Sequence, residues 1–241
     1  MIGWRARLGF LLPPGNPTVE PEVIALTPAG VSVHFHRLTA GGVPGSLDGQ
    51  EERNRAMVES LSECVRMLAM VKPEVIVVAH TATSYYLGRE REAELMSRLG
   101  AGSGVRVVTA FAAVVAALER LGVKRVAMGA PYSAETTAAG HRHLETHGFA
   151  VVRSQNLQGV TNIYDETAER GYRLARDIDS PEAEAVFLSG TGMPTLSVLE
   201  TLEADLGKPV LSSNAAMMWY ALRLAGVRQP IPGYGRLLTL A

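Results

Sequence analysis

Residues 73–84 of the chain, PEVIVVAHTATS, contain an unbroken apolar run, Val75–Ala79, and end in small and hydroxyl-bearing side chains. A short run that is rich in β-branched residues and bounded by proline on one side and polar residues on the other is typical of a strand in a parallel sheet. Residues 183–191, AEAVFLSGT, have the same form. In both segments a polar loop follows the strand directly, so the two loops are candidates for equivalent positions in the fold.

Similar runs alternate with longer segments of helical periodicity along the whole chain, which is the pattern of βαβ units. The pattern predicts eight strands, at Leu8–Leu12, Val31–Arg37, Val75–Ala79, Val105–Thr109, Arg125–Gly129, Ala150–Arg153, Ala185–Ser189 and Pro209–Ser212. It predicts eight helices, near residues 17–27, 51–71, 89–99, 111–121, 133–147, 161–178, 194–206 and 214–225. The expected fold class is therefore α/β.

The second half of the chain resembles the first half in three places. Besides the pair above, RLGFLLPPG (7–15) resembles RVAMGAPYS (125–133), and VVTAFAAVVAALERLG (107–122) resembles VLSSNAAMMWYALRLAG (210–226). Three pairs in the same order indicate a duplicated four-strand unit. We expect two similar four-stranded, Rossmann-like domains with a cleft between them: residues 1–110, completed by 215–241, and residues 111–214.

Charge and cysteine content narrow the class of partner. The 23 basic and 24 acidic residues give a formal net charge of −1 without a long run of one sign, so neither nucleic acid nor a membrane is an expected partner. The apolar run near the start is too short to span a membrane and lacks a cleavage site, and the single cysteine, Cys64, fits a reducing compartment. A cytoplasmic protein with a small-molecule ligand is expected.

Five loops follow the predicted strands at the edge where parallel sheets bind ligands. They are PPGN (13–16), HTATS (80–84), APYS (130–133), SGTGMPT (189–195) and SSN (212–214). These loops are rich in hydroxyl groups, glycine and proline and poor in charge. Such loops suit a carboxylate held by neutral donors and backbone amides, although each residue is also an ordinary turn or helix-capping residue.

At these loops the chain resembles the maleate isomerase and arylmalonate decarboxylase branch of the aspartate/glutamate racemase superfamily. The resemblance rests on LLPPGNPTVEPE (11–22), HTATSYYLG (80–88), APYS, LSGTGMPTL (188–196), KPVLSSNAAMMWYALRLAG (208–226) and GYGRLL (233–238), in family order and spacing. It implies two four-stranded parallel α/β domains related by a pseudo-two-fold axis, with a catalytic cysteine at the end of a corresponding strand in each half.

In this resemblance His80 stands at the position of the first cysteine and Gly190 at that of the second, and Cys64 lies on a predicted helix away from both. A thiolate nucleophile and a two-base proton shuttle are then unavailable, so a one-base site is expected. Imidazole is a competent general acid or base near neutral pH, which makes His80 the predicted catalytic residue. The alternative is a histidine that only hydrogen-bonds to neighbouring hydroxyl groups.

The predicted substrate-binding residues all lie in the strand-end loops: Asn16, Thr81, Ser84, Tyr132, Gly190, Thr191, Gly192 and Asn214. The threonines can also cap helices, the asparagines can close Asx turns, and Tyr132 can be a packing residue; these alternatives stay open. We expect no metal, because His34 and His36 have no third ligand nearby, and HRHLETHG (141–148) is typical of an exposed helix end. No nucleotide motif is present, so no cofactor is expected.

These observations predict an enzyme that acts on a small carboxylate or dicarboxylate through an enediolate-like carbanion. Decarboxylation, dehydration or tautomerisation needs a proton on one face only, so lyase or isomerase reactions are favoured over racemisation. The alternative is a non-catalytic protein that binds small carboxylates. The family resemblance also makes a homo-oligomer reasonable.

Overall fold

The strands form two separate four-stranded sheets in the computed structural model, which describes residues 2–240. The first sheet has the order β2-β1-β3-β4, from β1 (Ala6–Leu12), β2 (Val31–Arg37), β3 (Val75–Val78) and β4 (Arg106–Thr109). The second has the order β6-β5-β7-β8, from β5 (Arg125–Ala130), β6 (Ala150–Asn156), β7 (Ala185–Leu188) and β8 (Val210–Ser212). All neighbouring strands are parallel, so the predicted α/β fold class with two similar sheets is confirmed.

Each strand of the second sheet occupies the place of the strand four positions earlier in the first sheet. The strands form because their apolar runs are buried: β3 and β7 consist entirely of buried residues. The central strands are β1 and β3 in the first sheet and β5 and β7 in the second. Their carboxyl ends carry the loops that the sequence marks as candidate ligand loops.

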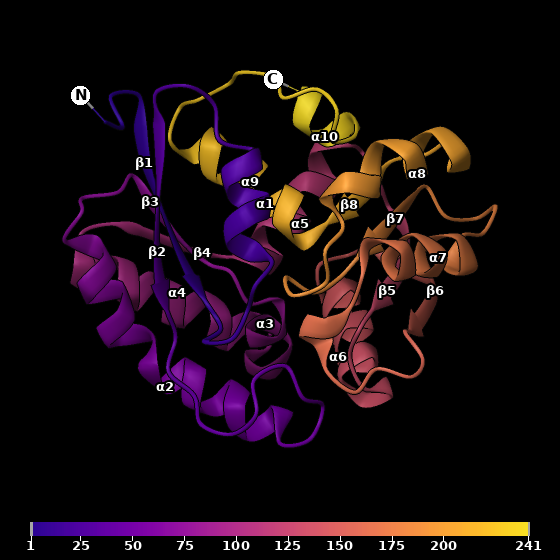
Figure 1. The fold of residues 1–241 in the computed structure, drawn as a ribbon, viewed down its shortest axis with the longest axis horizontal. Coiled ribbons are helices and arrows are strands. Elements are labelled where there is room, and N and C mark those ends of the chain that lie inside the picture. Colours follow the sequence, from indigo (N-terminus) through magenta and orange to yellow (C-terminus); the bar gives the residue numbers. More distant parts are fainter. Residues whose placement is uncertain (1, 241) are drawn as a thin grey trace.

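The helices surround the two sheets (Figure 1). They are α1 (Val19–Ala25), α2 (Gln50–Ala69), α3 (Thr81–Leu87), α4 (Arg89–Ser103), α5 (Ala110–Arg120), α6 (Ala134–Thr146), α7 (Ala168–Ile178), α8 (Leu199–Leu206), α9 (Ser213–Leu224) and α10 (Arg236–Thr239), with short 3-10 helices at Ile163–Asp165 and Leu196–Val198. No helix within residues 2–240 is long and apolar enough to cross a membrane.

Two helices are absent from the sequence-based prediction, and two, α7 and α8, begin several residues later than predicted. The missed helices are α3 and α10. The segment of α3 has no amphipathic period because most of it is buried, and Gly88, with φ of 73°, separates it from α4. The helix predicted near 161–178 begins only at Ala168, because the Thr167 side chain accepts a hydrogen bond from the Arg170 N–H and caps it there.

Helices α5 and α9 pack against each other between the two sheets (Figure 1). They are equivalent elements, since α5 follows the last strand of the first sheet and α9 follows the last strand of the second. Their buried side chains belong to one apolar cluster that contains residues of both halves. Helix α9 also packs against α1 and β3 of the first half; the domain boundaries near residues 110 and 214 stay a prediction.

Candidate active site

The carboxyl ends of the four central strands lie around a small cavity. Asn16 follows β1, His80 follows β3, Tyr132 follows β5 and Thr191 follows β7. The cavity is small, with a volume of about 30 Å³ open to a water-sized sphere, and its lining residues are Pro13, Asn16, Gly45, Ser46, Gln50, Arg53, Asn54, Met57, His80, Tyr132, Ile163, Tyr164, Thr191 and Gly192. A wider surface groove between α2 and α4 contains none of the strand-end residues. We therefore place the candidate site in the small cavity.

His80 lies at the junction of β3 and α3 and is only 8% exposed. Its Nδ1 lies 2.9 Å from Oγ1 of Thr83, one turn along α3. Its Nε2 has no hydrogen-bond partner within residues 2–240. Burial, together with the nearby charge of Arg53, lowers the pKa of His80 from 6.5 to about 4. The ring is therefore neutral at pH 7, with Nε2 left to interact with a ligand.

Hydroxyl groups connect the loops of the two halves beside the cavity. Oγ1 of Thr81 donates to Oγ of Ser213 at 3.0 Å, and the backbone N–H of Gly190 donates to the same oxygen at 3.2 Å. The phenol of Tyr132 is buried, and burial raises its pKa well above the usual value although hydrogen bonds with Thr81 and Ser189 oppose the shift. Tyr132 is therefore a neutral hydrogen-bonding group at physiological pH.

Asn16 both closes a turn and reaches the opposite half. Its Oδ1 accepts the N–H groups of Thr18 at 2.9 Å and Val19 at 3.1 Å, at the start of α1. Its Nδ2 donates to Oγ1 of Thr191 at 3.2 Å, and that hydroxyl donates to the carbonyl oxygen of Ala79 at 2.9 Å. The two roles left open for Asn16, turn and site residue, are thus compatible.

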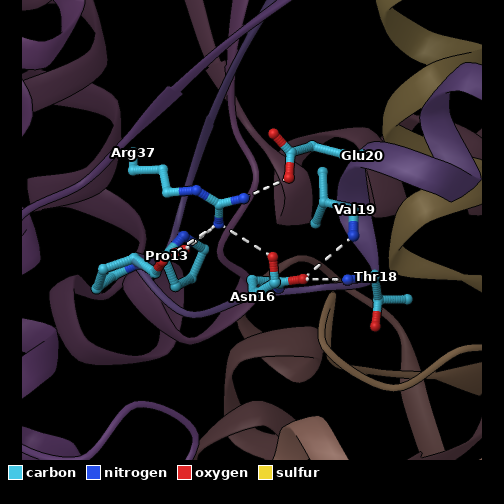
Figure 2. Close-up of polar contacts among 7 residues, drawn as sticks. Pro13, Asn16, Thr18, Val19, Glu20 and Arg37 are labelled. Atoms are coloured by element: carbon cyan, nitrogen blue, oxygen red, sulfur yellow. Dashed lines mark hydrogen bonds and ion pairs between the residues drawn. The ribbon is translucent and has the colours of Figure 1, made fainter.

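Arg37, the last residue of β2, holds the loop that carries Asn16 (Figure 2). Its guanidinium donates to the carbonyl oxygens of Pro13 and Pro14, both at 3.3 Å, and of Asn16 at 3.0 Å. It also forms an ion pair with Glu20 of α1. Because Arg37 is satisfied by these partners, it acts on the site by fixing the loop.

Asn214 lies behind the cavity wall and is not among the lining residues. Its Nδ2 donates to the Glu22 carboxylate at 2.6 Å and to the carbonyl oxygen of Thr191 at 3.2 Å. The other Glu22 oxygen accepts the N–H groups of Thr195 and Leu196, both at 2.8 Å. Burial raises the pKa of Glu22, and these hydrogen bonds oppose that shift. Asn214 and Glu22 therefore hold the loop that carries Thr191.

Ser84 points away from the cavity into a buried polar cluster. Its Oγ donates at 2.8 Å to the carboxylate of Glu92, which also accepts hydrogen bonds from Thr109 and, at 3.2 Å, from Nε2 of His143. The prediction that residues 141–148 form an exposed helix end is wrong for His143, which is 4% exposed. The reason is that α6 packs against α3, and the centroid of the His143 ring also lies 4.4 Å from that of Phe111 on α5.

The loop after β7 offers free backbone donors. The N–H groups of Thr191 and Gly192 have no hydrogen-bond partner in the described part of the chain. Gly190 has φ of 106°, and a Cβ built on it would lie 3.2 Å from the Tyr132 hydroxyl oxygen and 3.1 Å from Pro131. Glycine thus permits both the backbone conformation and the close approach of Tyr132.

Of the nine predicted site residues, the cavity wall contains Asn16, His80, Tyr132, Thr191 and Gly192, while Thr81, Ser84, Gly190 and Asn214 are not among its lining residues. Sequence reasoning missed three polar lining residues of α2, Gln50, Arg53 and Asn54, and the polar lining residues Ser46 and Tyr164. One signal was available: Asn54 stands in the buried stripe of α2, three residues before Met57 and seven before Leu61. A polar residue among the buried apolar residues of a helix indicates that its side chain faces polar groups or a cavity.

The only cysteine in the sequence does not lie in the cavity. Cys64 is 2% exposed in the apolar stripe of α2, and its Sγ lies 3.6 Å from the carbonyl oxygen of Arg37. Burial raises the pKa of this thiol. Among residues 2–240, no group of three or more His, Cys, Asp or Glu side chains is arranged to hold a metal ion.

Comparison with known proteins gives matches over nearly the full length. The arylmalonate decarboxylase family profile matches residues 8–238. Maleate isomerase of Nocardia farcinica is 30% identical, covering 96% of this chain and 95% of its own, and arylmalonate decarboxylase of Bordetella bronchiseptica is 30% identical, covering 95% of each. A solved structure of a cysteine-to-serine mutant of Nocardia farcinica maleate cis-trans isomerase, with a covalently bound succinylcysteine intermediate, superposes with a TM-score of 0.85 at 28% identity, covering 97% of this chain and 98% of that one.

These matches agree with the two-sheet architecture and with the resemblance drawn from the strand-end loops. The named relatives are isomerases and decarboxylases, so the family supports an enzyme of isomerase or lyase type. The chain belongs to the arylmalonate decarboxylase family.

Proposed function

We propose that this protein transforms a small carboxylate or dicarboxylate by one-base chemistry at the carbon next to a carboxylate, with His80 as the acid or base. The observation that carries the proposal is the environment of His80. Its ring is neutral at pH 7, Nδ1 is held by Thr83, and Nε2 is unpartnered in a cavity that also contains Asn16, Tyr132 and Thr191. A neutral imidazole in a fixed orientation is a suitable proton carrier.

The covalent route of a relative has no counterpart group in this cavity. A structure of the Nocardia farcinica enzyme contains a succinylcysteine, in which a cysteine sulfur is bonded to the ligand. Cys64 cannot form such a bond here without unfolding of α2, because it is buried in the helix stripe. On this proposal His80 and Gly190 stand at the two thiol positions of the family, and proton transfer replaces thiolate addition.

In the proposed reaction an enediolate forms and His80 handles one proton. With a malonate, the bond to one carboxylate breaks, CO₂ leaves, and the bonding electron pair forms the enediolate. As the negative enediolate forms beside it, the neutral ring of His80 takes up a proton from water, and it then delivers its Nε2 proton to the carbon. With a substrate that keeps its carboxylates, neutral Nε2 first removes the α-proton and later returns it to the same face. The free N–H groups of Thr191 and Gly192 and the Tyr132 phenol are suited to stabilise the negative oxygens.

The test is proton exchange and turnover in D₂O. Purified protein is incubated with phenylmalonate, maleate, malonate or succinate, and ¹H NMR follows loss of the α-proton signal or formation of product. We expect at least one compound to react above the protein-free rate. His80→Gln keeps the ring's volume approximately and should lower this rate about 10²- to 10⁴-fold, with succinate affinity changed less than about tenfold.

Three outcomes separate the alternatives. Full activity in His80→Gln would show that another group carries the proton, and Tyr132→Phe is then the next variant. Tight carboxylate binding without exchange or turnover in any of the four compounds would favour a non-catalytic binding protein. Activity that requires Cys64 would contradict the one-base proposal.

A further inference from the structure

The groove between α2 and α4 is wide, with a volume of about 760 Å³ open to a water-sized sphere. Both helices cover the same face of the first sheet, where their buried side chains share one apolar cluster. The groove floor contains Val65, Leu95 and Leu99. Its lining residues are about half of the roughly 20–30 residues that one partner contributes to a standard protein interface. The groove is therefore large enough to form the centre of an interface.

The two rims of the groove differ in charge. The α2 rim carries two acidic residues and one arginine: Glu59, Glu63 and Arg66. The α4 rim carries two arginines and one acidic residue: Arg91, Arg98 and Glu94. The α2 rim thus has an excess of negative charge and the α4 rim an excess of positive charge.

These charges do not neutralise each other across the groove. Glu63 forms an ion pair with Arg66 of its own helix at 2.6 Å, but the side chains of Glu59, Arg91 and Arg98 have no ion pair or hydrogen bond within residues 2–240. A single exposed charge without a partner is ordinary on a helix. The groove differs from that case because free charges of opposite sign lie on opposite sides of an apolar floor.

Gly102, in the last turn of α4, supplies a second and independent observation. It lines the groove, its φ is not positive, and a Cβ built on it would meet no other part of the chain within 4 Å. Gly100 differs, because its Cβ would lie 3.3 Å from the carbonyl oxygen of Val105. Glycine disfavours a helix relative to alanine, and nothing within this chain requires it at position 102. A glycine at the groove surface permits the close approach of another molecule.

We propose that the α2–α4 groove is the interface with a second copy of this chain, related by a two-fold axis perpendicular to the groove. In a two-fold interface the same surface meets itself, so it must be self-complementary. A second copy places each positive rim against a negative rim. A partner with charge of one sign would be attracted by one rim and repelled by the other. The net charge of −1 leaves two copies with little mutual repulsion.

The topology determines which charges meet. Helices α2 and α4 each return from the carboxyl end of one parallel strand to the amino end of the next, so they run parallel to each other. The two-fold axis then places α4 antiparallel to α2 of the partner. In this arrangement Arg98 lies against the partner's Glu59, and Arg91 lies against the partner's Glu63. Gly102 gives the partner's helix room at the end of α4.

The interface and the candidate active site occupy successive parts of α2. Met57 is the last α2 residue of the cavity wall, and Val58 is the first α2 residue of the groove. Association through the groove therefore leaves the lining of each cavity unchanged. The inference does not depend on the proposed reaction.

Sedimentation velocity at a series of protein concentrations measures the association. The wild type should reach the mass of two chains with a Kd of about 10 µM or lower. Arg98→Glu places two acidic residues against each other, and Glu59→Arg places two arginines against each other. Each variant alone should raise the Kd of the dimer about 10- to 100-fold. Arg55→Glu reverses a charge at an exposed position of α2 outside the groove and should change the Kd less than about twofold.

Mixing the two reversed variants provides the decisive measurement. In a mixed dimer Glu at position 98 of one copy meets Arg at position 59 of the other, and the remaining Arg98 meets the remaining Glu59. Equimolar Arg98→Glu and Glu59→Arg should therefore associate with a Kd within about threefold of the wild-type value. Recovery in the mixture separates pairing between copies from a general effect on the fold.

Gly102→Leu tests the close approach separately. The leucine meets no atom of its own chain, so the circular dichroism spectrum and melting temperature of the monomer should stay normal or improve. Its side chain occupies the space of the partner's helix, so the Kd of the dimer should rise at least about tenfold. The matched control is Gly104→Ala, just beyond the end of α4 and outside the groove, which should leave the Kd unchanged.

The proposal is overturned if the wild type sediments as a single chain at every concentration. It is also overturned if a dimer forms that Arg98→Glu, Glu59→Arg and Gly102→Leu leave unchanged, because the interface then lies elsewhere. Two weakened single variants that do not recover when mixed would contradict the pairing of these charges between copies.

Discussion

Nε2 of His143 lies 3.2 Å from the carboxylate of Glu92, and this contact joins α6 of the second half to α4 of the first. Both side chains are buried, at 4% and 6% exposure. Glu92 also accepts a hydrogen bond from Ser84 on α3, the helix that begins directly after His80. The cluster therefore ties the two halves together and holds α3 in place behind the candidate catalytic histidine.

Replacing Glu92 should destabilise the fold. Glu92→Gln removes the charge from a buried group with three partners, and we expect a loss of about 3 kcal/mol in the free energy of unfolding. Urea denaturation measures the change, with Glu94→Gln at an exposed position of the same helix as the control. Equal urea midpoints for the two variants would show that the cluster contributes nothing to stability.

The stability of the protein should fall in acid, partly because of His80. Burial lowers its pKa in the folded state from 6.5 to about 4, so as the pH falls the unfolded chain takes up a proton first. The free energy of unfolding should therefore decrease between pH 6.5 and 4, by about 3 kcal/mol from this group. His80→Gln should show a flatter pH dependence than the wild type in this range. Parallel curves would mean that His80 is not buried in the neutral form.

Glu92 should contribute to acid sensitivity at lower pH. Burial by itself raises its pKa, but hydrogen bonds from His143, Thr109 and Ser84 reverse this effect, so the pKa is lowered in the folded state. A carboxyl group with a lowered pKa contributes stability above its unfolded value, and this contribution is lost as the pH falls through the folded value. Denaturation of Glu92→Gln below pH 4.5 should thus depend less on pH than that of the wild type. An unchanged slope would contradict the assignment.

A side chain at position 190 should not be accepted without rearrangement. Gly190 has φ of 106°, and an added Cβ would approach Pro131 and Tyr132 to between 3.1 and 3.2 Å. Gly190→Ala should cost about 1–3 kcal/mol in the free energy of unfolding and displace the free N–H groups that follow it. Thermal unfolding and succinate titration measure the two effects, with Gly104→Ala as a control. Gly104 also has a positive φ, of 69°, but its Cβ would meet no atom within 4 Å. Equal losses in both variants would show that backbone conformation alone is responsible.

Replacing the thiol should leave the reaction unchanged. Cys64 lies outside the cavity, so Cys64→Ser should keep kcat/KM within about twofold for any substrate that the protein turns over. Its cost in stability should be about 1 kcal/mol, because a hydroxyl replaces a buried thiol that already contacts the carbonyl oxygen of Arg37. If the variant loses activity while its circular dichroism spectrum and melting temperature stay normal, the Cys64 thiol takes part in the reaction.

Much of the architecture follows from local sequence. Runs such as Val75–Val78 and Ala185–Leu188 are long enough, apolar enough and bounded clearly enough to specify strands, and all eight predicted strands are present. Parallel pairing then places the strand-end loops on one edge of each sheet, and the expected cleft between two similar halves is why His80, Asn16 and Thr191 could be assigned to one site without coordinates. Helix α3 escaped prediction because burial on several sides removes the periodicity that identifies a helix.

The direction of individual side chains depends on packing between elements far apart in the chain. Ser84 and Asn214 were placed in the correct loops, yet they face Glu92 and Glu22, because those carboxylates arrive from α4 and α1. Arg53 and Asn54 reach the cavity only because of the way α2 is rotated about its own axis. The buried apolar residues of α2 fix this rotation through contacts with β1, β2 and β3 of the first sheet. Periodicity identifies which residues share a helix face. It does not encode what lies opposite that face, since this depends on the sum of many long-range contacts.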